Sequence, residues 1–269
     1  MYGFVGTFAG MAVQLAERGE PVRLSRKLLS LVARETLAVG LSRAMAPLGW
    51  GQPTPARTQQ GQDQRPPVLL LPGYRLNRSI LFGLHTFLSR RGFSWVWPVS
   101  LSRGKRIADH AADLARHVAT LKATTGAEQI DIVGFSMGGL VAGWYVQHLD
   151  GAPHVRRLVT IGTPWRGTKM SVFGRNAVAR DGAWRAPILD GLTPVPVGTL
   201  SIWSPEDPLV VPATSAAPDA MDSVRIDGAG HTEMMFSARV YRAVYEALLH
   251  SDEVAMWRER DALATEDAG

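Results

Sequence analysis

Short apolar runs alternate with longer amphipathic stretches through most of the chain. The runs predict buried strands at 67–71, 93–98, 130–133, 155–161, 197–203 and 223–226. The amphipathic stretches have apolar residues at helical spacing and predict helices, chiefly at 81–91, 107–125, 140–146 and 236–250. Strands that alternate with helices of about ten residues or more are typical of an α/β fold with a doubly wound, mostly parallel sheet.

This alternation stops between Thr163 and Val197. The intervening stretch has no periodic pattern, yet it contains several large apolar residues, among them Trp165, Phe173 and Trp184. Long insertions at the carboxyl edge of a parallel sheet are usually functional. We therefore expect a cap or lid at about 165–195 that covers a functional site and offers an apolar binding surface.

A different pattern precedes the first strand. Residues 1–16 carry no charge, but they fall short of the roughly 20 apolar residues that span a bilayer. They also lack the basic start and the cleavage site of a secretory signal. At 21–45, apolar residues recur at three- and four-residue steps among arginines, which predicts a basic amphipathic helix. Such a helix either packs against its own domain or lies on an anionic membrane surface, and the pattern leaves both open.

The chain therefore divides into four parts. A helical extension at 1–50 precedes a Pro- and Gln-rich stretch at 51–66, which is typical of a solvated linker. The α/β domain follows at 67–250, and 251–269 is a charged, alanine-rich tail. A length of 269 residues suits one such domain with modest additions.

Composition narrows the chemistry. The chain has no cysteine, which excludes disulfides, thiolate metal sites and a cysteine nucleophile but leaves the redox compartment open. The net charge is +5, and +4 of it lies before residue 67. The α/β domain is nearly neutral and has no basic patch with aromatic residues, so we expect no nucleic-acid partner. We expect a cytoplasmic or peripheral-membrane protein without a metal or cofactor, and the oligomeric state stays open.

Ser136 occupies a glycine-flanked turn between a strand and a helix. It lies within Gly-Phe-Ser-Met-Gly at 134–138, after the apolar run 130–133 and before the helix at 140–146. A serine in so sharp a turn has strained backbone angles, and the flanking glycines remove clashes that side chains would cause. The same turn directs the N–H of Met137 toward the space in front of the hydroxyl, where a developing oxyanion is best held. The pattern indicates a nucleophile elbow.

A five-residue match of this kind also arises by chance. Ser136 could instead cap a helix after a glycine turn, as serines often do. The strand–turn–helix setting and the chain order of the partners that follow favour the nucleophile.

A serine hydroxyl needs a base to take its proton, and the base needs an acid to orient it. The strand at 197–203 ends just before Glu206-Asp207-Pro208, and we assign Asp207 as the acid. Glu206 is the neighbouring rival, and a pair of solvated turn carboxylates is the third interpretation.

Among the seven histidines, His231 stands where the base is expected. It follows Gly228-Ala229-Gly230 after the last predicted strand and precedes the last helix. The other histidines lie in predicted helices or at their ends. His110 and His117 are expected on the surface of one long helix.

A second oxyanion donor should come from the loop after the first strand, close in space to the elbow. Tyr74 follows Leu71-Pro72-Gly73 in that position, and its N–H is the expected donor. The alternative is a simple Pro-Gly turn.

Four sequence blocks carry a family resemblance when they are combined. They are Leu-Leu-Pro-Gly-Tyr at 70–74, the stretch 125–139 around Ser136, Leu-Val-Thr-Ile-Gly-Thr-Pro-Trp-Arg-Gly-Thr at 158–168, and 207–212 followed by Gly230-His231. Together they resemble the α/β-hydrolase superfamily and, within it, the bacterial triacylglycerol lipases and esterases. The likeness covers about 66–250 and leaves 1–65 outside.

The chain departs from these families at two positions. Pro72 and Phe135 stand where the families usually have histidine, so the acyl and alcohol pockets need not match, although neither residue does the chemistry. The calcium ion bound by some of these lipases cannot be carried over, because its aspartates find no match here.

The resemblance and the motifs together predict a carboxylic ester hydrolase. It would act on small-molecule or lipid-like acyl esters through Ser136, His231, Asp207 and an acyl-enzyme intermediate. The expected substrate contacts are Phe135, Trp165, Phe173 and Trp184. The alternatives are acyl transfer to another acceptor, thioester or amide cleavage on the same triad, and a non-catalytic scaffold that binds a partner or ligand.

Overall fold

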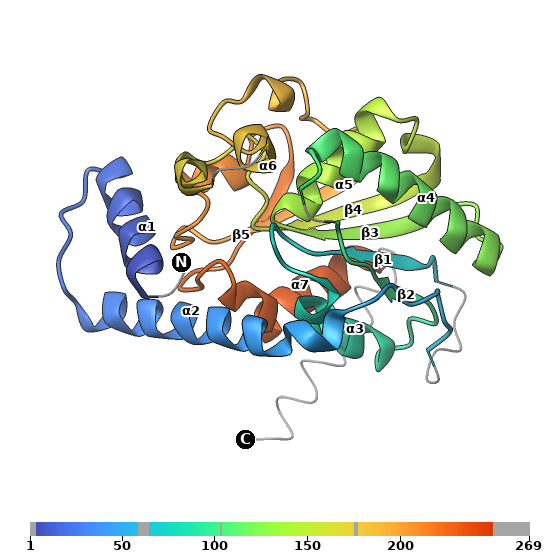
Figure 1. Ribbon diagram of the computed structural model, residues 1–269, viewed down its shortest axis with the longest axis horizontal. Helices are drawn as coiled ribbons and strands as arrows, with labels where there is room; N and C mark the ends of the chain where they lie inside the picture. The colour runs from blue at the N-terminus through green and yellow to red at the C-terminus, as the bar shows by residue number, and fades with distance from the viewer. Residues whose placement is uncertain (1–3, 59–64, 103, 175–176, 250–269) are drawn as a thin grey trace.

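The computed structural model describes residues 4–58, 65–102, 104–174 and 177–249. Its centre is one sheet of six parallel strands in the order β2-β1-β3-β4-β5-β6. The strands are β1 (Val68–Leu71), β2 (Val96–Pro98), β3 (Ile130–Phe135), β4 (Val155–Ile161), β5 (Gly198–Trp203) and β6 (Asp222–Arg225). The α/β fold with a doubly wound parallel sheet, predicted from the sequence, is confirmed (Figure 1).

Helices cover both faces of the sheet (Figure 1). They are α3 (Phe82–Ser89), α4 (Ile107–Thr125), α5 (Met137–His148) and α7 (Ala238–Leu248). Successive side chains of a strand point to opposite faces, so a strand that is buried on both sides contributes residues to two hydrophobic cores. Leu69 and Leu71 pack with α4 and α5, whereas Val68 and Leu70 pack with α3 and α7. The loops at the carboxyl ends of the strands gather at one edge, where α/β folds place their sites.

The N-terminal extension forms two helices, α1 (Phe4–Glu17) and α2 (Arg26–Met45). α2 runs along the body on the side of α3 and α7 and contacts the turn before α7 (Figure 1). Its inner face buries Leu28, Leu31 and Val32, which form a small core cluster with Met11 of α1. The helix therefore packs against its own domain, which is one of the two placements that its pattern allows. Within the described residues, no helix is both long enough and apolar enough to cross a membrane.

Much of the apolar content at 165–195 belongs to the main core. The described part has 3-10 turns at Lys169–Phe173 and Pro187–Leu189 and a short helix α6 (Ala177–Asp181). Trp165, Leu189 and Leu192 pack in the core cluster beside α5. Val172 and Phe173, by contrast, are exposed at the surface.

The described residues of the stretch 51–66 are exposed or half-buried, and they also contact the body of the domain. The described part of the stretch hydrogen-bonds to the chain around β2: the N–H of Thr58 donates to the carbonyl oxygen of Ser94 at 2.8 Å. The indole N–H of Trp97 donates to the carbonyl oxygen of Pro53 at 2.9 Å. β2 is an edge strand, and a segment that covers such an edge satisfies its unpaired backbone groups. Residues 59–64 and the predicted tail at 251–269 lie outside the described residues.

Candidate active site

Ser136 lies in a strained turn between β3 and α5. Its backbone has φ of 54° and ψ of −120°, in the left-handed region that residues other than glycine rarely adopt. A Cβ at Gly134 would lie 2.6 Å from the backbone of Gly139, and one at Gly138 would lie 2.8 Å from a backbone oxygen of Leu71. Glycine is therefore required on both sides of the serine, as the nucleophile-elbow pattern predicts. Such strain costs about 1–3 kcal/mol and is typical of functional sites.

Asp207 and His231 form a buried, hydrogen-bonded pair. Asp207 follows β5, His231 follows β6, and Nδ1 of His231 lies 2.7 Å from Oδ2 of Asp207. The other oxygen, Oδ1 of Asp207, accepts the N–H groups of Leu209 at 2.7 Å and Val210 at 2.9 Å. Both oxygens are thus occupied, which fixes the carboxylate and, through it, the orientation of the imidazole.

The rival carboxylate, Glu206, faces other partners. Its Oε2 accepts the N–H of Gly228 at 2.9 Å, and its Oε1 lies 3.4 Å from the ammonium of Lys27. Of the two adjacent acids, Asp207 is therefore the one that the fold brings to His231.

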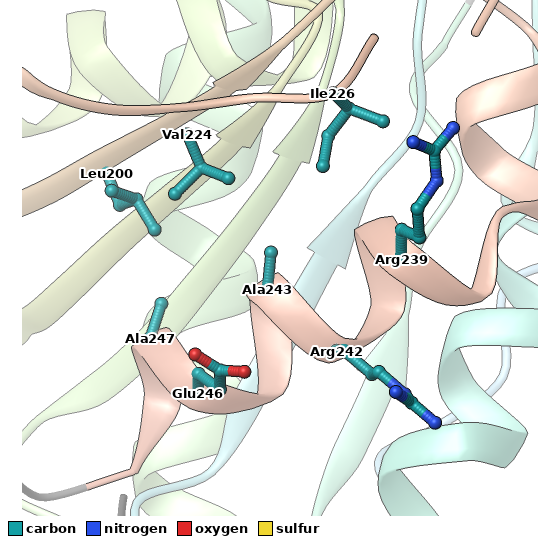
Figure 2. Close-up of a pocket in the computed structure, with 8 residues that line it drawn as sticks. All are labelled: Leu200, Val224, Ile226, Arg239, Arg242, Ala243, Glu246 and Ala247. Atoms are coloured by element: carbon teal, nitrogen blue, oxygen red, sulfur yellow. The ribbon is translucent and has the colours of Figure 1, made fainter. Parts of the chain in front are cut away.

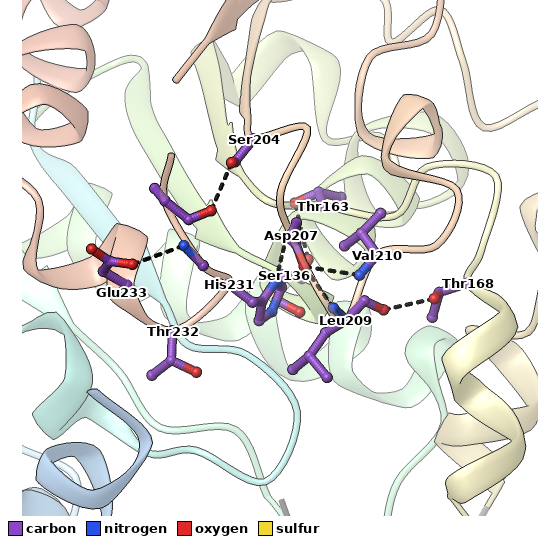
Figure 3. A network of polar contacts seen from close by, with 12 residues as sticks. Ser136, Thr163, Thr168, Ser204, Asp207, Leu209, Val210, His231, Thr232 and Glu233 are labelled. Atoms are coloured by element: carbon purple, nitrogen blue, oxygen red, sulfur yellow. Dashed lines mark hydrogen bonds and ion pairs between the residues drawn. The ribbon is translucent and has the colours of Figure 1, made fainter. Parts of the chain in front are cut away.

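The strand ends bring these residues to one place. A Cβ at Gly162, just after β4, would lie 3.2 Å from Nδ1 of His231 and 3.3 Å from Oδ2 of Asp207. Ile161, the preceding residue, accepts the N–H of Ser136 at 2.8 Å. Figure 3 shows Ser136, Asp207 and His231 together at this edge of the sheet, with Thr163 beside them. The arrangement can perform nucleophilic chemistry assisted by a general base.

The surroundings raise the pKa of His231 above its ordinary value. Burial disfavours the charged imidazole and by itself lowers the pKa. The charge of Asp207 and its hydrogen bond oppose that effect, and the buried carboxylate of Glu35 adds to them. The net result is a pKa above that of a histidine in water, so His231 holds its proton more tightly than it would in solvent.

The predicted oxyanion donors line a large cavity. A Cβ at Gly73 would lie 3.1 Å from the Cβ of Ser136, so the turn that carries Tyr74 lies directly beside the elbow. Tyr74 and Met137 both border a cavity of about 950 Å³. Arg43 and Trp50 of the N-terminal region form part of its wall.

His110 also lines this cavity, which corrects its expected place on the surface of α4. It is almost fully buried, because it lies on the helix face that Ile107 and Leu114 turn toward the sheet. The spacing of these three residues, three and then four apart, could have shown this from the sequence. Burial lowers the pKa of His110, so its imidazole is neutral near pH 7.

The four predicted substrate contacts are not gathered in one place. Phe135 is buried with its ring centroid 4.9 Å from that of His231, and Trp165 lies in the core. Phe173 is exposed, and Trp184 is half-buried beneath the guanidinium of Arg185. None of the four is among the described residues that line the 950 Å³ cavity.

A second cavity, of about 450 Å³, lies between α7 and the strands β5 and β6. Leu200, Val224 and Ile226 face Ala243 and Ala247 across it (Figure 2). Its described lining contains neither the elbow nor the His231–Asp207 pair, so the larger cavity is the one that adjoins the candidate site.

Comparisons with known proteins agree with this fold. A family model for the alpha/beta hydrolase fold matches residues 59–186. The mature form of Bacillus licheniformis lipase BlEst2 aligns with a TM-score of 0.65 at 14% identity, over 72% of this chain and 96% of that one. Aspergillus fumigatus lipase B aligns with a TM-score of 0.60 at 17% identity, over 74% of this chain and 56% of that one. A Pyrobaculum calidifontis esterase aligns with a TM-score of 0.56 at 17% identity, over 91% and 97%.

At such low identities these structures establish a shared fold. In this chain that fold is the six-stranded parallel sheet with helices on both of its faces. On these grounds the chain has the α/β-hydrolase fold, and its fold resembles that of bacterial lipases and esterases.

Proposed function

We propose that this protein is a serine hydrolase that cleaves carboxylic esters. The observation that carries the proposal is the buried His231–Asp207 pair, bonded at 2.7 Å, at the sheet edge where Ser136 occupies its strained turn. With Asp207 on Nδ1, the nitrogen left for Ser136 is Nε2 of His231. The lipase and esterase neighbours support the same class of reaction.

The proposed reaction has two steps. In the first, the Ser136 oxygen bonds to the ester carbonyl carbon while His231 takes the hydroxyl proton. The bond to the alcohol oxygen then breaks, and His231 gives the proton to the departing alkoxide. In the second, a water oxygen bonds to the acyl carbon and its proton goes to His231. The Ser136–acyl bond breaks, the acid leaves, and Ser136 recovers the proton.

The backbone N–H groups of Met137 and Tyr74 are the proposed oxyanion donors. Each tetrahedral intermediate places a negative charge on the former carbonyl oxygen, and fixed N–H donors stabilise it. Met137 is the first residue of α5, where N–H groups have no partner within the helix. This position beside Ser136 supports the assignment.

We place the substrate in the 950 Å³ cavity that Tyr74 and Met137 border. Its volume is at the upper end of the roughly 300–1,000 Å³ of small-molecule sites, so a long acyl chain would fit. Apolar walls from Trp50, Leu76 and Leu101 support a lipid-like acyl group. The segment 165–195 stays a proposed cap, whose exposed apolar residues are Val172 and Phe173.

The test is Ser136→Ala, with Ser237→Ala as a control at a serine whose side chain makes no capping hydrogen bond. Loss of the nucleophile should lower turnover of p-nitrophenyl esters by several orders of magnitude and abolish labelling by a fluorophosphonate probe. The control should keep both. Near-normal turnover in Ser136→Ala would overturn the proposal, and an unlabelled wild-type protein would favour the non-catalytic scaffold.

We also propose that the extension contacts an anionic membrane surface. Most of the exposed large apolar side chains in the described residues lie before residue 51. On α2, Leu29, Leu37 and Leu41 are exposed on the side opposite the buried face. Basic residues flank them, and Trp50 is both exposed and part of the cavity wall. A bilayer on this surface would therefore lie at the mouth of the cavity.

A further inference from the structure

Glu35 is a buried carboxylate of α2 that reaches the loop of His231. It is about 1% exposed. Its Oε1 accepts the N–H of Thr232 at 2.8 Å, and its Oε2 accepts the N–H of Glu233 at 2.9 Å. These two donors are the residues directly after His231. The carboxylate therefore holds the backbone from which the imidazole projects.

We propose that Glu35, in helix α2 of the N-terminal extension, is a positioning residue for His231. The inference rests on the proposed function, because it assigns a role to Glu35 only if His231 is the base. Asp207 fixes the far end of the His231 side chain through Nδ1. Glu35 fixes its near end through the backbone, so the two acids together determine where Nε2 lies.

Packing alone does not account for an acid at this position. The same face of α2 buries Leu28, Leu31 and Val32, and a further apolar residue would complete it. Burying a carboxylate instead costs free energy unless hydrogen bonds compensate. Here each oxygen has a backbone N–H donor. The fit is also close, because a Cβ at Gly230 would lie 2.5 Å from Oε2 of Glu35.

Other contacts of the extension reach both triad loops. Arg34, next to Glu35, donates to the carbonyl oxygen of Gly228 at 2.7 Å and pairs with Glu233 at 2.7 Å. The amide of Gln14 in α1 donates to the carbonyl oxygen of Pro205 at 3.1 Å. The extension thus connects the loop of the proposed acid to the loop of the proposed base.

The charge of Glu35 also acts on His231. Burial raises the pKa of Glu35, while the N–H donors and the charge of His231 oppose that rise. In turn the carboxylate helps to raise the pKa of His231, after the larger effects of burial and Asp207. Other charged groups near this loop, among the described residues, include the ion pairs Arg34–Glu233, Lys27–Glu206 and Arg225–Asp227, whose basic members are exposed. The exposed Arg239 also donates to the carbonyl oxygen of Asp227 at 2.8 Å.

Three variants distinguish the effect of the hydrogen bonds of Glu35 from the effect of its charge and from a general effect on the extension. Glu35→Gln keeps the shape but sets an NH₂ group against a backbone donor, so kcat should fall roughly ten- to a hundredfold with KM little changed. Neutral imidazole is the base, and loss of a nearby anion lowers the pKa of His231. The acidic limb of the pH–rate profile, where activity falls as His231 becomes protonated, should therefore move to lower pH.

Glu35→Asp keeps the charge but is one methylene too short to reach both N–H groups. Its kcat should fall while the acidic limb stays near its wild-type position. Glu20→Gln removes an exposed acid from the same extension and should leave kcat and the limb unchanged.

The outcomes distinguish this proposal from the proposed function. If Ser136→Ala is inactive but Glu35→Gln keeps the wild-type kcat and acidic limb, Glu35 is not a positioning residue and the triad stands. If Ser136→Ala stays active, the proposed function itself is wrong. Should Glu35→Gln not fold, Glu35→Asp decides, because an unchanged kcat there overturns the proposal as well.

Discussion

The N-terminal extension and the segment 165–195 are both additions to the sheet, but they serve the proposed site in different ways. Much of the apolar content of 165–195 belongs to the main core. The segment reaches the loop of Asp207 through Thr168, whose hydroxyl donates to the carbonyl oxygen of Leu209 at 2.6 Å. The extension has a small core cluster of its own. Its polar residues contact both triad loops, and its end lines the cavity.

This difference shows that the apolar content of a segment does not by itself place it beside the candidate site. The segment with the large aromatic residues uses Trp165 to complete the core. The basic helix α2, which has the weaker apolar pattern, reaches the active-site loops through Glu35 and Arg34. Polar contacts at the carboxyl edge of the sheet, rather than hydrophobicity, connect the extension to the candidate site.

The largest expected effect concerns stability and compares two leucine-to-alanine variants. Leu192 of the segment is fully buried in the main core, so Leu192→Ala should cost about 2–5 kcal/mol of unfolding free energy. Leu31 of α2 is equally buried, but in the separate cluster. Leu31→Ala should leave the main unfolding midpoint near the wild-type value and increase hydrogen exchange along α2. Urea unfolding and exchange measurements check both, and equal midpoint shifts would show that extension and body unfold together.

A smaller effect concerns the acyl chain and compares two tryptophans. Trp50 of the extension lines the cavity, whereas Trp184 of the segment is not among its described lining. Trp50→Ala should raise KM for long-chain p-nitrophenyl esters roughly three- to tenfold, through loss of about 1 kcal/mol of apolar contact, and change acetate esters little. Trp184→Ala should affect both substrates equally. A selective loss of long-chain activity in Trp184→Ala would instead support the acyl-binding lid expected from the sequence.

Sequence patterns predict those structural features that depend on residues close together in the chain. The strands follow from apolar runs, and the elbow at Ser136 follows from its flanking glycines, because both are local. The proposed role of Glu35 is not local: its spacing of seven from Leu28 and four from Leu31 places it on the buried face of α2, but its partner Thr232 lies 197 residues away. The contacts of the linker with the edge of β2 are not predicted for a similar reason, since that edge lies later in the chain.

The two faces of α2 present a related difficulty. A basic amphipathic pattern suggests one apolar face, which would meet either the domain or a membrane. The structure gives the helix a buried face at Leu28, Leu31 and Val32 and a second set of exposed leucines opposite. Packing against the body therefore leaves apolar surface free for a further contact.

The smallest expected effect tests which region meets a lipid surface. Each exposed leucine contributes only part of the roughly 1.5–3 kcal/mol of full burial, and each basic residue about 1 kcal/mol near anionic lipid. The double variant Leu37→Ser/Leu41→Ser should therefore reduce flotation with phosphatidylserine vesicles several-fold, whereas Val172→Ser/Phe173→Ser in the segment should not. Binding of the wild-type protein should weaken on neutral phosphatidylcholine vesicles and in high salt, which screens the basic residues. If only the segment variant loses flotation, the membrane-facing region is the cap, and if the wild-type protein never floats, neither region docks on lipid.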